Sequence, residues 1–146
     1  MSSPVLVHVG VRASNLERTI RFWRDGLGLR VASTIPADSS TPHCYDLTDG
    51  HHNFRVFQHN GPERPANVTG LLDYLHVGVV VPNLGEAANR LHGLGFHIYW
   101  DGVSGGQAIG AFDPANPPSE SFKVEDPDGI TVDVTGSSDQ WPGVGL

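Results

Sequence analysis

The chain has 146 residues, of which nine are Lys or Arg and sixteen are Asp or Glu, so its formal net charge is −7. This length suits one compact domain or two half-size modules that share a core. The negative charge disfavours nucleic acid and anionic membrane surfaces as partners. No apolar run approaches the roughly 20 residues that span a bilayer, the N-terminus lacks a secretory pattern, and a single cysteine, Cys44, forms no internal disulfide. We therefore expect a cytoplasmic protein whose partner is a small molecule.

Glycine, proline and histidine are unusually frequent in this chain. The 18 glycines and 11 prolines indicate many tight turns, which suit short strands better than a helical bundle. Eight histidines stand beside only nine Lys and Arg residues. Histidine is the commonest metal ligand, although a single histidine is more often structural than functional. Their positions must therefore decide which of them carry function.

The sequence contains an internal repeat. Three short segments recur in the same order, the first two at an offset of 68 residues and the third one residue out of phase: His-Val-Gly-Val at 8–11 and 76–79, Asn-Leu at 15–16 and 83–84, and Gly-Leu-Gly at 26–28 and 93–95. Order, spacing and residue type agree, which indicates a duplication.

The first copy predicts one strand, one helix and three further strands. The β-branched run at residues 5–11 is typical of a strand. Ser14 or Asn15 can then cap a helix with one apolar face, which ends at the glycines near residue 28. The further strands are expected at residues 29–33, 43–47 and 52–58, the last two joined by a turn at Asp49 and Gly50.

The second copy predicts the same order of elements. We expect a strand at residues 74–81, a helix at 83–94 that Gly85 and Gly93 weaken, and strand-like runs at 96–100, 107–112, 121–125 and 130–134. The intervening segment 101–120 is either a binding loop or a disordered insertion. These patterns predict an α+β protein of two tandem βαβββ modules, at residues 1–66 and 67–136. Residues 60–72 form the linker, and Trp141 anchors a tail at 137–146.

Paired βαβββ modules that each open with a histidine resemble the vicinal oxygen chelate superfamily. This group includes glyoxalase I, methylmalonyl-CoA epimerase, fosfomycin and bleomycin resistance proteins, and extradiol dioxygenases. Residues 15–29 resemble its pattern D-L-x-x-S-x-x-F-Y-x-x-x-L-G-L, and residues 126–134, DPDGITVDV, resemble D-P-D-G-N-x-I-E-L. The resemblance covers nearly the whole chain and implies a glyoxalase/dioxygenase-like fold, with mixed curved sheets that enclose a cleft. It does not fix the reaction, because the superfamily performs several chemistries on one scaffold.

The resemblance implies metal ligands on the first and last strands of each module. Carried over by position, these are His8, His76 and Asp133, the last standing where the family usually has Glu. The matching position of the first module falls at Phe54 or Arg55, neither of which binds a cation. Two imidazoles and one carboxylate are typical of non-haem Fe(II) sites. The expected cofactor is therefore a divalent metal, Fe(II) first, with Ni, Zn or Mn as alternatives.

Two further matches favour ring cleavage. Lys123 stands where the extradiol pattern S-F-Y-V-x-x-P-x-G has Tyr, so its ammonium could stabilise a substrate oxyanion, or it is simply an exposed cation. His59 lies in a segment that resembles F-L-H-x-N, whose histidine serves as acid and base, or it merely caps its strand. A shift of register would make His52 a fourth metal ligand.

Three hypotheses for function follow. The first is an Fe(II) extradiol-type dioxygenase acting on a small aromatic diol, with a metal on His8, His76 and Asp133 and with His59 and Lys123 as catalytic residues. The second is a glyoxalase- or epimerase-like lyase or isomerase using Ni, Zn or Co. The third is a metal-free protein that binds a small molecule such as an antibiotic, using aromatic side chains such as Trp23 and Trp100, although core packing is the simpler role for Trp23. We expect a homodimer, with the cleft closed either within one chain or between two.

Overall fold

The structure is a computed structural model that describes residues 5–40, 42–59, 75–103, 105–139 and 141–146. The chain divides into two compact units, Met1–Arg64 and Pro65–Leu146, and each unit has its own mixed sheet. The predicted α+β class with two modules is thereby confirmed. The predicted linker and the predicted boundary between residues 66 and 67 lie outside the described residues. Among the residues described, no helix has the length and apolar character needed to cross a membrane.

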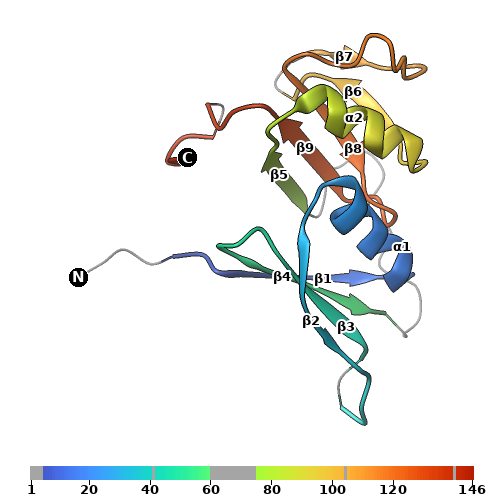
Figure 1. The fold of residues 1–146 in the computed structure, drawn as a ribbon, viewed down its shortest axis with the longest axis vertical. Coiled ribbons are helices and arrows are strands. Elements are labelled where there is room, and N and C mark those ends of the chain that lie inside the picture. Colours follow the sequence, from blue (N-terminus) through green and yellow to red (C-terminus); the bar gives the residue numbers. More distant parts are fainter. Residues whose placement is uncertain (1–4, 41, 60–74, 104, 140) are drawn as a thin grey trace. The chain divides into compact units, whose positions relative to one another are not determined.

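The first unit, Met1–Arg64, has a four-stranded sheet with one helical segment (Figure 1). Strand β1 pairs in parallel with β4, and the β4–β3 and β3–β2 pairs are antiparallel, so the strand order is β1-β4-β3-β2. The elements are β1 (His8–Ala13), α1 (Leu16–Ile20), the π-helical η1 (Arg21–Gly26), β2 (Arg30–Ile35), β3 (Cys44–Thr48) and β4 (Asn53–Gln58).

The helical segment begins at Asn15, one of the two predicted caps. The Asn15 side-chain oxygen accepts a hydrogen bond from the Arg18 backbone N–H at 3.1 Å, which satisfies a donor that the first turn leaves unpaired. Trp23 is 1% exposed, and its ring lies 4.5 Å from the ring of Phe54 on β4. The helix therefore packs on the Phe54 face of the sheet, and Trp23 belongs to the core.

The second unit, Pro65–Leu146, has a five-stranded sheet in the order β5-β9-β8-β6-β7 with helix α2 over one face (Figure 1). Asn83 caps α2 as Asn15 caps α1, its side-chain oxygen accepting from the Glu86 N–H at 2.9 Å. The predicted strand at 107–112 is reduced to two residues. The elements are β5 (His76–Val80), α2 (Leu84–Gly93), β6 (Ile98–Asp101), β7 (Gln107–Ala108), β8 (Ser121–Glu125) and β9 (Thr131–Thr135).

The registers of the two sheets define equivalent positions. In the first unit Gly10 on β1 pairs with Arg55 on β4, and in the second unit Gly78 on β5 pairs with Asp133 on β9. Arg55, not Phe54, is therefore the counterpart of Asp133. The alternation of side chains along a strand explains this, because Phe54 faces the helix and its neighbour must face away from it.

We call the face of each sheet that does not carry the helix its open face. Paired residues of neighbouring strands point to the same side. In the first unit the open face includes His8, Gly10, Arg12, Asn53, Arg55 and Phe57. In the second unit it includes His76, Gly78, Val80, Thr131, Asp133 and Thr135.

Candidate functional site

Three predicted site residues meet on the open face of the second unit. The His76 Nε2 atom lies 2.8 Å from Oδ2 of Asp133, and the Lys123 ammonium donates to Oδ1 of the same carboxylate at 2.7 Å. The Asp133 side chain is only 11% exposed, whereas that of His76 is 44% exposed. The carboxylate is thus held from one side by a cation, and the imidazole beside it faces solvent.

The strand pattern explains why these three residues meet. Lys123 on β8 pairs directly with Asp133 on β9, so their side chains leave the sheet on the same side. His76 begins β5, the other neighbour of β9, two residues before the residue that pairs with Asp133. Val132 and Val134 are fully buried on the opposite face, which fixes the direction of the Asp133 side chain.

The open face of the first unit carries a longer polar network around His8. The Nδ1 atom of His8 is hydrogen bonded to Oδ1 of Asn53, and the Asn53 side chain also bonds to Asp46. Asp46 accepts two bonds from Arg55, at 2.6 and 2.8 Å, and one from the Ser33 hydroxyl at 3.0 Å. The network fixes the ring of His8 through Nδ1 and leaves Nε2 on the open face, above Gly10.

Asp46 is the most strongly perturbed carboxyl of this network. The Arg55 guanidinium, helped by the Asn53 and Ser33 hydrogen bonds, holds the pKa of Asp46 well below its usual range, even though burial acts in the opposite direction. Asp46 therefore stays ionised across the physiological pH range, and its partners stay in place.

The two units carry the same ion pair with the charges exchanged. Asp46 on β3 pairs with Arg55 on β4, whereas Lys123 on β8 pairs with Asp133 on β9. In the first unit the cation therefore stands at the last-strand position where the second unit has a carboxylate. This exchange leaves one last-strand carboxylate in the chain, as the sequence predicted.

His59 lies at the far end of its sheet from His8. The His59 backbone N–H donates to the carbonyl of Ala13 at the end of β1, whereas His8 begins the same strand. At about 3.3 Å per residue, the strand separates the two ends by roughly 17 Å. This separation argues against the predicted role of His59 as an acid–base group beside a metal bound to His8.

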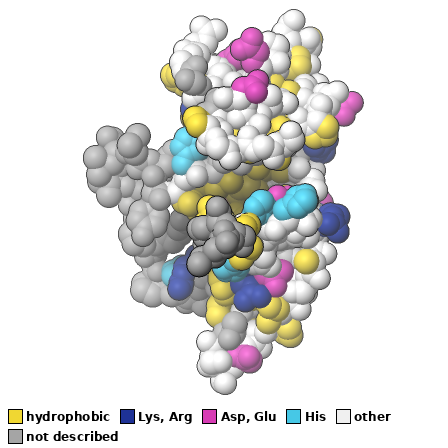
Figure 2. Space-filling view, turned by 90° about the vertical axis from the view of Figure 1, so that its left-hand side faces the viewer, with side chains coloured by type: hydrophobic (Ala, Val, Ile, Leu, Met, Phe, Trp, Pro, Cys, Tyr) yellow, Lys and Arg dark blue, Asp and Glu magenta, His cyan; other side chains and the backbone are white. Residues whose placement is uncertain are grey.

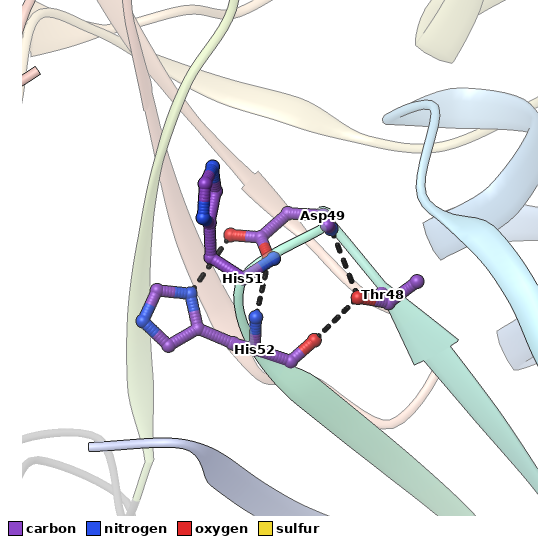
Figure 3. A network of polar contacts seen from close by, with 5 residues as sticks. Thr48, Asp49, His51 and His52 are labelled. Atoms are coloured by element: carbon purple, nitrogen blue, oxygen red, sulfur yellow. Dashed lines mark hydrogen bonds and ion pairs between the residues drawn. The ribbon is translucent and has the colours of Figure 1, made fainter. Parts of the chain in front are cut away.

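His52 lies in the β3–β4 hairpin, which Figure 3 shows. Its Nδ1 atom lies 2.9 Å from Oδ2 of Asp49, and Oδ1 of Asp49 accepts from the His51 and His52 backbone N–H groups. Burial raises the pKa of Asp49, but these hydrogen bonds outweigh it and lower the pKa to about 2. Within the part of the chain that the structure describes, the contacts of His52 are those of a turn residue.

The predicted ligands can be tested for their fit to a metal ion. Ligand atoms that bind one cation at right angles and about 2.1 Å each lie roughly 3 Å apart. His76 Nε2 and Asp133 Oδ2 form an ion pair at 2.8 Å, which holds the two atoms close to this spacing. Among the described residues, no group of three or more His, Cys, Asp or Glu side chains is arranged to hold a metal ion. The second unit thus supplies two fitting donors, and the first supplies one oriented imidazole at His8.

Histidine side chains also reach the surface on the face of the molecule shown in Figure 2, where they lie beside hydrophobic side chains. Both His8 and His76 are exposed.

The predicted binding loop at 101–120 borders a hollow of about 420 Å³. Its lining is polar and formed by Asp101, Gly102, Gly106, Gln107 and Ser119 to Ser121. None of the predicted site residues lines this hollow, so the loop and the His76–Asp133 pair are separate features.

Sequence reasoning missed Asn53, Asp46 and Trp141 as parts of these open faces. The signal for Asp46 was present in the repeat, because aligning Arg55 with Asp133 places Asp46 opposite Lys123 with the charges reversed. No pattern in the sequence locates the partner of Trp141, which lies against Gly78.

Comparisons with known proteins agree with this fold. The chain is 27% identical over 154 aligned positions to a protein named lactoylglutathione lyase from Salmonella typhimurium, and the alignment covers 96% of this chain and 98% of that protein. Glyoxalase I of Leishmania major is similar in structure, with a TM-score of 0.66 at 16% identity over 94% of this chain and 90% of that chain. The fosfomycin resistance protein FosX of Mesorhizobium loti has a TM-score of 0.63 at 16% identity, over 93% of this chain and 94% of that chain.

The family model of the Glyoxalase/Bleomycin resistance protein/Dioxygenase superfamily matches residues 5–134. The match includes both first-strand histidines and both ion pairs, and it ends one residue before the end of β9. The chain therefore belongs to the Glyoxalase/Bleomycin resistance protein/Dioxygenase superfamily.

Proposed function

We propose that this chain is a metal-dependent lyase or isomerase that acts on a small molecule with two neighbouring oxygen atoms. His8, His76 and Asp133 are the proposed metal ligands. The observation that carries the proposal is the 2.8 Å separation of His76 Nε2 and Asp133 Oδ2, two atoms from different strands at ligand spacing. The matching orientation of His8 by Asn53 supports the third ligand.

The protein side chains have defined tasks in this proposal. Lys123 holds one oxygen of Asp133, and the other oxygen is paired with His76, so that both proposed ligand atoms of the second unit lie together. Asn53 fixes the tautomer of His8, because an amide oxygen accepts only from a protonated Nδ1, and the lone pair is then on Nε2. A bound divalent metal would polarise the substrate oxygens and ease removal of a neighbouring proton.

The choice of a lyase or isomerase over a dioxygenase depends on two residues. His59 lies roughly 17 Å along the strand from His8, and the Lys123 ammonium is already paired with Asp133. These two features count against the dioxygenase hypothesis and favour the lyase or isomerase proposal. The relative named lactoylglutathione lyase, aligned over 96% of this chain, supports the lyase alternative and with it Ni or Zn in place of Fe.

A metal-free binding protein is the second candidate, and Arg55 favours it. Its guanidinium occupies the position equivalent to Asp133, so the first unit places a cation where the second places a metal-binding group. The guanidinium is paired with Asp46 and is no metal ligand, so this position suits a polar small molecule better than a fourth metal bond.

An activity assay separates these functions. Protein loaded with Ni²⁺ or Zn²⁺ is mixed with the hemithioacetal of methylglyoxal and glutathione, and thioester formation is followed by absorbance. We expect turnover that is lost in Asp133→Ala and kept in His97→Ala, which removes a histidine outside the proposed site. Oxygen uptake by Fe²⁺-loaded protein with catechol, without thioester formation, would reject the lyase proposal.

A further inference from the structure

The C-terminal tail places an aromatic ring on the open face of the second unit. The six-membered ring of Trp141 lies against Gly78 on β5, and its Cε2 and Cη2 atoms are 2.9 Å from the position that a Cβ on residue 78 would occupy. Any larger residue at this position would collide with the ring. Gly78 therefore creates the space that Trp141 fills.

The ring lies next to the proposed metal ligands. Gly78 pairs with Asp133 across the β5–β9 ladder, and His76 is two residues away on the same face. Paired residues of neighbouring strands are about 5 Å apart, and alternate residues of one strand about 7 Å. Trp141 thus covers Gly78, which pairs with Asp133 on β9 and lies two residues after His76 on β5.

Two hydrogen bonds link the tail residues around the ring to one another and to the end of β9. The Thr135 hydroxyl at the end of β9 donates to the Ser137 carbonyl at 2.7 Å, and the Trp141 backbone N–H donates to the Ser138 carbonyl at 2.9 Å. Two chain turns therefore hold the ring close to the end of β9. An aromatic group that is already ordered contributes to binding without a further entropy cost.

The neighbouring side chain extends the apolar surface. Val80, the next open-face residue of β5 after Gly78, is 37% exposed. The open face therefore has polar donors at His76 and Asp133 and an apolar surface at Trp141 and Val80. Such a combination suits a ligand with an oxygen-bearing head and a flat apolar body.

We propose that Trp141 forms a stacking wall beside the His76–Asp133 pair and selects substrates that carry a planar, aromatic group next to the two metal-binding oxygens. This inference rests on the proposed metal site and adds the substrate class to it. Its test must therefore separate binding of the oxygens from binding of the ring.

Two hydroxamates make that separation. Acetohydroxamate and benzohydroxamate share one chelating head, and only the second has an aromatic ring. Their affinities for the Ni²⁺-loaded protein are measured by titration calorimetry. In the wild type we expect benzohydroxamate to bind roughly three- to tenfold more tightly. Trp141→Ala should abolish this preference while the affinity for acetohydroxamate stays unchanged.

Glycine variants provide a second test that keeps the tryptophan. Gly78→Ala places a methyl group in the volume of the Trp141 ring and should also abolish the preference. Gly93→Ala is the control for the glycine-to-alanine exchange, because a Cβ at Gly93 in α2 meets nothing within 4 Å. Trp100→Phe, which removes a half-buried indole bonded to the Gly105 carbonyl, should keep the preference as well.

The outcomes distinguish the two proposals. If Trp141→Ala and Gly78→Ala both keep the preference for benzohydroxamate, or if the wild type has no preference, the proposed role of Trp141 is rejected. The proposed metal site is then unaffected. If acetohydroxamate fails to bind the Ni²⁺-treated wild type, the metal site is rejected and the wall with it.

Discussion

His76 Nε2 lies 2.8 Å from Asp133 Oδ2, on two strands that pair in parallel. The equivalent positions of the first unit hold His8 and Arg55, so the duplication has kept the imidazole in both copies and the carboxylate in one. This asymmetry leads to predictions for the metal site and for the ion pairs. The cap of α2 gives a further prediction for stability.

Removal of the Asn53 side chain should weaken metal binding. Asn53→Ala frees Nδ1 of His8 and allows its ring to turn, so we expect about a tenfold loss of Ni²⁺ affinity in calorimetry. Asn116→Ala is the control, because it removes the same amide from an exposed loop where it bonds to Asp113. An affinity that is unchanged in Asn53→Ala would show that Asn53 does not position His8 for metal binding.

Exchange of the charges in the first unit should create a fourth ligand. A protein with both Asp46→Lys and Arg55→Asp copies the Lys123–Asp133 pair of the second unit. We expect its Ni²⁺ affinity to rise at least about tenfold, since ligand number determines affinity in such sites. Arg55→Met, which removes the cation without adding a carboxylate, should give a smaller increase. Equal affinities in the two variants would contradict the equivalence of Arg55 and Asp133.

Asp46 should make folding stability depend on pH in the acid range. Its folded-state pKa is lowered from the ordinary 3.8, so its stabilisation is fully present above that value and is lost as pH falls through the folded pKa. We expect Asp46→Asn to lower the free energy of unfolding by about 1–2 kcal/mol at pH 7, and the difference to shrink below pH 3.8. Urea unfolding at several pH values measures this, with Asp139→Asn as the exposed control. A difference that is constant with pH would remove the ion pair as its cause.

The cap of α2 should contribute measurably to stability. Asn83→Ala removes the acceptor of the Glu86 N–H, and we expect a loss of about 1 kcal/mol in the free energy of unfolding. Asn83→Asp keeps an acceptor at the same place and should retain most of the stability. Thermal unfolding of the two variants compares them directly, and equal melting temperatures would argue against the cap.

Much of this arrangement could be predicted from the sequence. The repeat located His8 and His76, and local signals located the caps and most strands, because capping and alternation act over a few residues. The choice between Phe54 and Arg55 needed the pairing register, which alternation alone does not fix. The partners of Asp46 and Trp141 come from strand pairing and from the path of the tail, and neither leaves a local pattern.

The most direct test of the metal site is titration of the metal-free protein with Ni²⁺ or Zn²⁺ by calorimetry. We expect one ion per chain in the wild type and in His97→Ala, and a loss of affinity of at least about a hundredfold in His76→Ala and in Asp133→Ala. Absence of saturable binding in the wild type, or equal affinity in His76→Ala, would contradict the account.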